Sequence, residues 1–554
     1  MPAAIEWEAI ASQHRTKQQQ AIPQDWIIPH SKLKELNGTG TANEGRLIAL
    51  EATRKSALLT EKELEITEIY GARELLSKIH TGGFSSEEVT VAFCKRAALA
   101  QQLTSCLTEI FFDEGIARAR QLDQHLKATG KPIGPLHGLP ISLKDSFVVK
   151  GHYATVGYVE FLKRPPPTAN SAMVNLLLDA GAVFFCKTNI PQTMMTADSQ
   201  NNIFGRTLNP HKTSLTAGGS TGGEGALVAF RGSVLGIGTD IAGSVRIPSL
   251  CCGVYGFKPT ADRTPFDGQS FYPFPKLHLP GVTPVAGPIA NSVDDLILLM
   301  ETTLARRPWE YDASAVGIPW RSLDNAKKTL TIGVLPEDPN YSLHPPVRRA
   351  LDEAVSSLKA AGHDIVRLPS DPSCSPGLGG KLGFTFFGLT SSSLDTLANE
   401  IGEPLVSSVE RNVHPFADTK PPVSPELDKA HQLSEFLSLR GSYANSWRKT
   451  WRENNLEVVL GPGATSTAVP HDTYGVPVYT LMWNVLDYPA GIIPYGIASK
   501  AKDPQYQKAT GRFDADYDPE ASDGAPCAIQ VVAPRFRDEE CLQAIRIIDR
   551  DIRR

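Results

Sequence analysis

The feature that most constrains the fold is the alternation of short apolar runs with glycine-rich loops and helical patterns between about residues 135 and 260. The runs at 139–143, 182–186 and 233–238 have the length and apolar character of buried strands. A helical pattern over 171–181 lies between two of them and stops at its final glycine. Strands that alternate with helices predict a layered α/β fold around a mostly buried sheet.

The remainder of the chain divides into an arm and one large domain. Residues 1–75 are polar and rich in lysine and glutamate, and they predict an N-terminal helical arm. Ser85 and Glu88 have the spacing of a capping box, which predicts the start of a core helix. Because no linker or internal repeat divides 76–554, we expect one domain there.

The second half of the chain contains fewer sequence patterns that predict secondary structure. Residues 332–335 predict a strand, and 344–360 predict a helix that opens at a proline pair. Residues 265–280 are rich in proline and aromatic residues and predict a loop, whose stretch 271–275 suggests an aromatic lid. Residues 370–425 are rich in serine, proline and glycine and give no assignment.

Composition excludes several classes of function. The net charge of -5 is too small to indicate binding to nucleic acid or to an anionic membrane. No run approaches the ~18 apolar residues of a transmembrane segment, and the first residues do not resemble a secretory signal. The eight cysteines form no CxxC pair, which argues against a zinc or thioredoxin-type site and fits a reducing compartment. We therefore expect a cytoplasmic protein without a structural metal.

Lys144 is the first candidate for chemistry. It ends the apolar run 139–143, whereas most lysines lie at the surface. The apolar residues before it favour burial, and burial favours the neutral amine because desolvation penalises the ammonium. A neutral lysine can accept a proton, so the sequence predicts a general base.

Ser220 lies in a second motif, the glycine-rich loop 218–225. A phosphate-binding P-loop would need a lysine after the spacer, and none follows here. The glycines permit close backbone approach, so the loop predicts unusual backbone torsions around the serine.

Ser244 lies in a third motif, Gly236 to Pro248, which does not match the dinucleotide-binding fingerprint. The pattern predicts a tight turn between a strand and a helix. The backbone N–H groups of Ile241, Ala242, Gly243 and Ser244 would converge on one point, as stabilisation of an oxyanion requires.

Together and in this order, the three motifs resemble the amidase signature family, which carries a Ser-Ser-Lys triad. The resemblance extends from about residue 70 to about 550. It rests on further matching segments, namely 187–194, 205–210, 256–260, 287–296, 484–489 and 524–530. Within the family, the chain is most similar to the fungal acetamidases and general amidases, and its core also resembles fatty acid amide hydrolase.

This resemblance implies a layered α/β/α amidase signature fold, with a central mixed, mostly parallel β-sheet covered by helices and a catalytic domain over 76–554. It implies that Ser244 is the nucleophile, Ser220 the bridging serine held in a cis peptide with Gly219, and Lys144 the base. Met194 matches a position that lines the acyl side of the site, although a core methionine is an equal alternative. No metal or cofactor is implied.

Two residues depart from the family pattern. Thr221 replaces a second serine but keeps its hydroxyl, so little effect is expected. Ala242 replaces a common glycine, which would narrow the site if the turn needed a positive φ there. Asp145 and Asp240 are interpreted as hydrogen-bond anchors, and Arg246 as a residue that fixes the catalytic turn.

The implied activity is hydrolysis of a small-molecule monoamide to the acid and ammonia through an acyl-enzyme. Two alternatives stay open: an acyl-transferring or biosynthetic amidase of a secondary metabolite pathway, and an amidotransferase-type subunit that delivers ammonia to a partner. Relatives often form dimers, which makes a homodimer an open expectation. His137 and His471 are interpreted as structural or surface residues, and loops in 190–205, 270–285 and 370–485 as the pocket walls.

Overall fold

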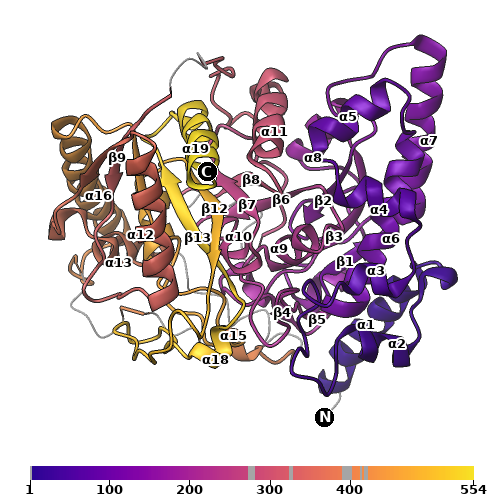
Figure 1. Cartoon of the computed structure of the whole chain (residues 1–554), viewed down its shortest axis with the longest axis horizontal. Helices are drawn as coiled ribbons and strands as arrows, with labels where there is room; N and C mark the ends of the chain where they lie inside the picture. The colour runs from indigo at the N-terminus through magenta and orange to yellow at the C-terminus, as the bar shows by residue number, and fades with distance from the viewer. Residues whose placement is uncertain (1–2, 272–280, 324–327, 390–401, 412–414, 417–421) are drawn as a thin grey trace.

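The structure is a computed structural model that describes residues 3–271, 281–323, 328–389, 402–411, 415–416 and 422–554. Its centre is an eleven-stranded sheet flanked by helices. The first half of the chain lies on one side of the molecule and the second half on the other (Figure 1). This arrangement confirms the predicted layered α/β fold.

The strands cross the large sheet in the order β1-β3-β2-β6-β8-β7-β12-β13-β11-β9-β10. Their bounds are β1 Leu107–Ile110, β2 Pro140–Lys144, β3 Val183–Thr188, β6 Leu235–Asp240, β7 Tyr255–Lys258, β8 Val285–Ala290, β9 Thr331–Val334, β10 Asp364–Arg367, β11 Val458–Gly461, β12 Ala490–Ile497 and β13 Pro526–Val532. A separate hairpin-like pair consists of β4 Gln200–Asn201 and β5 Gly205–Arg206.

The expectation of a mostly parallel sheet is wrong. Within the described residues, only β3–β2, β2–β6, β11–β9 and β9–β10 pair in parallel, and the other six neighbouring pairs are antiparallel. The strands recognised in the sequence, β2, β3, β6 and β9, each have at least one parallel neighbour. The central strands were not predicted, and there the chain returns antiparallel, as from β7 to β8, which needs no crossover helix.

The helices flank this sheet, and in the described part of the chain none combines the length and apolarity that crossing a bilayer requires. Helices α10, α12 and α19 all pack against β12 or β13. The α-helix bounds are α1 Ala3–Gln20, α2 His30–Leu36, α3 Ala52–Ser56, α4 Glu61–Glu68, α5 Ala72–His80, α6 Ser86–Thr104, α7 Phe112–Thr129, α8 Ala172–Asp179, α9 Gly222–Ala229, α10 Arg246–Cys252, α11 Val293–Ala305, α12 Pro345–Ala360, α13 Pro376–Gly388, α15 Ser407–Glu410, α16 Lys429–Glu453, α17 Val478–Val485, α18 Pro519–Ser522 and α19 Asp538–Ile552.

Most predicted elements lie close to their expected bounds. The capping box is confirmed: the Ser85 hydroxyl accepts the Glu88 N–H at 3.0 Å, and the Glu88 carboxylate accepts the Ser85 N–H at 3.0 Å. The unassigned stretch 370–425 contains α13 and α15. Residues 272–275 of the expected aromatic lid lie outside the described residues.

The N-terminal arm packs on the same core as the rest of the chain. Several of its buried side chains, among them Ile22 and Leu47, belong to the main hydrophobic cluster. Helix α1 is fixed to β1 by His14, whose Nε2 lies 2.7 Å from Glu109 Oε1, and by Gln18, which donates to the same oxygen at 3.1 Å. Burial raises the pKa of Glu109, but the bonds from His14 and His152 outweigh it and lower this pKa to about 2, so the carboxylate is charged.

We predict that His14→Ala loosens α1. The substitution leaves the buried Glu109 carboxylate with fewer donors, at a cost of ~1–3 kcal/mol. Hydrogen exchange should therefore show reduced protection of α1 amides. The matched control is His30→Ala at an exposed position of the arm, which should leave that protection unchanged. Equal protection in both variants would contradict this account of arm docking.

Candidate active site

Lys144 lies at the carboxyl end of β2 and is fully buried. Its Nζ lies 2.7 Å from the Ser220 hydroxyl oxygen and 2.7 Å from that of Thr239. Strands β2 and β6 are parallel neighbours, with Leu143 opposite Ile237, which brings the end of β6 beside the lysine. The carboxyl ends of parallel strands are the usual place for a ligand site in such sheets.

The environment of Lys144 favours its neutral amine. Burial lowers its pKa to about 7, and the nearby carboxyl groups of Asp240, Asp145 and Glu224 offset only part of this effect. Near neutral pH, a large fraction of the side chain is therefore uncharged and able to accept a proton.

Ser220 sits in the turn that leads into α9 and is almost completely buried. The peptide bond between Gly219 and Ser220 is cis, as the family resemblance implied. A Cβ on Gly219 would lie 2.3 Å from the carbonyl oxygen of Thr196, so only glycine fits there. The retained hydroxyl of Thr221 donates to the Thr239 carbonyl at 3.3 Å, which ties the loop to β6.

Ser244 lies in the turn between β6 and α10 and is 9% exposed. The turn needs glycine at Gly243, whose φ is +129°. Ala242 does not have a positive φ, so its methyl group causes no backbone strain. The Thr480 hydroxyl donates to the Ala242 carbonyl at 2.6 Å and orients this peptide.

A buried ion pair holds the turn. Asp240 accepts the N–H groups of Gly243 at 2.9 Å and Val245 at 3.2 Å, and Arg246 donates to both of its oxygens at 3.0 Å. Burial raises the pKa of Asp240, but the Arg246 guanidinium more than compensates and brings it to about 2. Asp240 and Arg246 thus act as the predicted anchors, and Asp145 has a similar role toward the Thr155 N–H at 2.7 Å.

The structure brings the predicted site residues together only in part. Lys144 and Ser220 are hydrogen-bonded, whereas among the described residues no hydrogen bond joins Ser220 to Ser244. The N–H of Gly243 already donates to Asp240. The groups of Ile241, Ala242 and Ser244 are the remaining candidates for an oxyanion hole.

A cavity of about 440 Å³ opens at Ser244. Its lining includes Met194, Ile241, Ala242 and residues that the sequence placed in the expected wall loops, with Phe384 and 472–477 among them. Residues 512–516 also line it and were not foreseen. The wall of the cavity thus contains both apolar and charged side chains.

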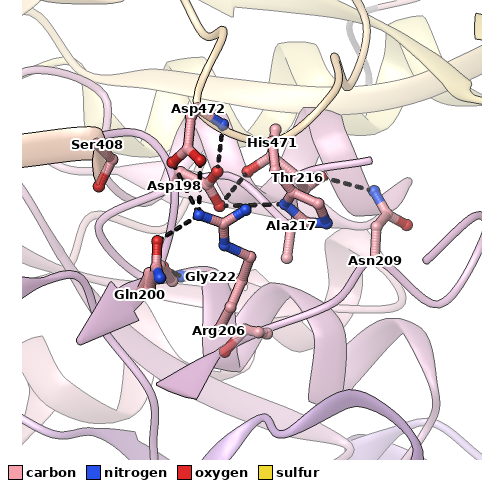
Figure 2. A network of polar contacts seen from close by, with 12 residues as sticks. Asp198, Gln200, Arg206, Asn209, Thr216, Ala217, Gly222, Ser408, His471 and Asp472 are labelled. Atoms are coloured by element: carbon pink, nitrogen blue, oxygen red, sulfur yellow. Dashed lines mark hydrogen bonds and ion pairs between the residues drawn. The ribbon is translucent and has the colours of Figure 1, made fainter. Parts of the chain in front are cut away.

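A polar network borders this cavity (Figure 2). Arg206 donates to both carboxylate oxygens of Asp472, at 2.7 and 2.9 Å, and Asp198 accepts the Asp472 N–H at 2.7 Å. His471 contacts Asp198 at 3.5 Å and the carbonyl of Thr213 at 3.0 Å. His471 does not itself line the cavity but contacts Asp198, which does.

His137 lies in the core, away from this cavity. It is fully buried, and its Nδ1 accepts the N–H of Ile133 at 3.0 Å. The interpretation of this histidine as structural agrees with the geometry. In the described ranges, no group of three or more His, Cys, Asp and Glu side chains is arranged to hold a metal ion.

Sequence reasoning missed two buried residues beside Lys144. Thr239 is the second hydrogen-bond partner of the lysine, and its place directly after the predicted strand 233–238 was the available signal. Glu224 accepts hydrogen bonds from Ser142 at 2.6 Å and Thr188 at 3.0 Å. Burial raises the pKa of Glu224 to about 8, so it is mainly uncharged near neutral pH, and of the three nearby carboxyl groups it raises the pKa of Lys144 least.

Comparison with known proteins gives consistent matches. A family model described as "Amidase" matches residues 88–542. An "Amidase" of Gibberella moniliformis is 41% identical over 556 residues, covering 99% of each chain, and an "Acetamidase" of Emericella nidulans is 35% identical, covering 97% of this chain and 96% of the relative. A solved "Fatty acid amide hydrolase" is similar in structure, with a TM-score of 0.87 and 30% identity, covering 99% of this chain and 96% of that one.

We predict that Gly243→Ala destabilises the turn at Ser244. A Cβ there would lie 2.4 Å from the Thr480 hydroxyl oxygen, and the positive φ adds strain of ~1–3 kcal/mol. Denaturant unfolding should report the loss. The matched control is Gly317→Ala, where a Cβ would meet nothing within 4 Å. A stability equal to that of the control would show that the turn tolerates a side chain.

Proposed function

The chain belongs to the amidase signature family, and we propose that it hydrolyses a carboxylic monoamide to the acid and ammonia through a Ser-Ser-Lys triad. The observation that carries this proposal is the buried amine of Lys144 at 2.7 Å from the Ser220 hydroxyl, at the end of a strand and next to the cavity of Ser244. A neutral amine in this place is suited to proton transfer near pH 7.

In the proposed reaction, Lys144 takes the Ser220 proton as Ser220 takes the proton of Ser244. The Ser244 oxygen then attacks the amide carbonyl and forms a tetrahedral intermediate. This sequence requires the Ser244 side chain to turn toward Ser220 when substrate binds, because catalytic hydrogen bonds often tighten only in the complex.

The oxyanion of that intermediate would be held by backbone N–H groups at Ile241, Ala242 and Ser244. Loss of one such donor costs ~10²–10³ in rate in enzymes of this kind. The Asp240–Arg246 pair supports this role because it fixes the peptide planes of the turn before substrate arrives.

Collapse of the intermediate breaks the C–N bond. The proton held by Lys144 returns through Ser220 to the leaving nitrogen, and ammonia departs from the acyl-enzyme on Ser244. Water then attacks the ester carbonyl and gives a proton to the same relay. As the acyl C–O bond breaks and the acid leaves, the relay returns this proton to the Ser244 oxygen. Every proton taken is thus returned.

The substrate class is proposed from two observations. The relatives include proteins named acetamidase, and the cavity of about 440 Å³ is large enough for a small aliphatic or aryl-substituted acyl group. Met194 lines this cavity and is our candidate for a contact to that group.

We predict that the protein releases ammonia from members of a panel running from acetamide to phenylacetamide and indole-3-acetamide, and that Ser244→Ala releases none. The control Ser77→Ala is exposed on α5 and should keep full activity. Acid production without an added acceptor distinguishes hydrolysis from acyl transfer. Turnover by Ser244→Ala would reject the nucleophile.

We predict that kcat/KM decreases on the acidic side of its pH profile (the acid limb). Because the pKa of Lys144 is lowered to about 7, the neutral base is lost as the pH falls through that value, and kcat/KM should fall with it. Lys144→Met should lose ~10²–10⁴ in kcat/KM together with this limb. Lys449→Met, at an exposed site on α16, should keep both. If Lys144→Met kept the same decrease of kcat/KM at low pH, the titrating group would be a residue other than Lys144.

A further inference from the structure

Residues 402–411, which include α15, lie against the loop 189–206 at the edge of the cavity. We propose that this segment is a strap that determines which amides the active site accepts, and that Glu403 positions it. The inference rests on the proposed amidase function, and it adds a specificity element outside the triad.

The strap is anchored at its start by a buried carboxylate. Glu403 is 3% exposed, and it accepts the N–H of Val159 at 2.9 Å on one oxygen. Its other oxygen accepts the side-chain amides of Gln192 at 3.0 Å and Asn202 at 3.1 Å. Three donors thus converge on one acceptor group that comes from a segment more than 200 positions away in sequence.

The neighbouring backbone strengthens this anchor. The side-chain amide of Asn202 also donates to the Pro404 carbonyl at 2.7 Å, and the side-chain oxygen of Gln192 accepts the Val406 N–H at 3.0 Å. Leu405 packs against the small hydrophobic cluster that contains Met194. The strap therefore contacts the same segment that supplies the candidate acyl-group contact.

The far end of the strap joins the polar network beside the cavity. Ser408 lies 3.3 Å from the Thr196 hydroxyl, and Arg206 donates to the Ser407 hydroxyl at 3.3 Å. The same guanidinium binds Asp472, which lines the cavity from another loop. Figure 2 shows Ser408 beside this network, so the strap is held at both ends.

Two strap residues, Ser408 and Arg411, line the cavity together with Ser244. The position of the strap thus sets the size and polarity of one wall. If the strap were displaced, the cavity would have more room for bulky acyl groups. Small acyl groups would lose their contacts with this wall. Because a single group at a pocket wall changes discrimination by ~10–200-fold, the effect should be measurable in substrate preference.

The test compares kcat/KM for phenylacetamide and acetamide in wild type and Glu403→Gln. The carboxamide presents an NH2 group where one of the two carboxylate oxygens accepted a donor, so no orientation satisfies all three donors. We expect the phenylacetamide-to-acetamide ratio to rise about tenfold, mainly through KM for acetamide, while kcat for phenylacetamide changes little.

Two further variants make the result decisive. Glu410→Gln is the matched control, because Glu410 is exposed on the same strap and does not line the cavity. Asn202→Ala removes two bonds to the strap and leaves Glu403 in place, so it should give a smaller change in the same direction. Asn202→Ala also tests the proposal if Glu403→Gln does not fold.

Equal losses for both substrates in Glu403→Gln and Asn202→Ala would overturn the proposal and leave the strap with a purely structural role. An unchanged ratio in both variants would also overturn it. Failure of the amidase proposal looks different, because wild type would then release no ammonia from either amide.

Discussion

The arrangement of the site depends on one interaction, the hydrogen bonding of a fully buried lysine amine to two hydroxyl groups. Lys144 has no room for solvent, so its charge would be unfavourable, and its neutral form accepts or donates hydrogen bonds to Ser220 and Thr239. Burial also raises the pKa of the nearby Glu224 to about 8, so its carboxyl group, mainly uncharged near neutral pH, does little to favour the charged lysine. The neighbouring strands and the cis peptide at Ser220 are arranged around this amine.

A second constraint is electrostatic and lies on the other side of the turn. Asp240 and Arg246 bury opposite charges in contact, and their remaining hydrogen bonds include the backbone of the turn, the Thr480 carbonyl, and the side chains of Asn484 and Gln530. A buried pair of this kind is costly to break, since either partner alone would be an unpaired charge. The pair therefore connects the turn at Ser244 both to β6, through Asp240, and to β13, through Gln530.

Much of the fold and of the candidate site could be predicted from local sequence. The strands β2, β3 and β6, the cap at Ser85 and the roles of Asp240 and Arg246 as anchors follow from patterns within a few residues. The mostly parallel sheet was a wrong expectation, because strand direction in the centre depends on which distant strands become neighbours. The hydrogen bond between the hydroxyls of Ser220 and Ser244 stays a prediction, since spacing along the chain does not fix a side-chain torsion.

By itself, the sequence determined the residue types and their order: a lysine at the end of an apolar strand, a serine in a glycine loop, and a serine in a strand-to-helix turn. It also determined the layered α/β class. Only the tertiary structure decided that Thr239 is also hydrogen-bonded to Lys144 and that residues 512–516 line the cavity. It alone also decided that Glu403 anchors the strap by accepting hydrogen bonds from distant segments. The physical reason is that these contacts join segments far apart in the chain, and their geometry exists only once the sheet order has set which segments meet.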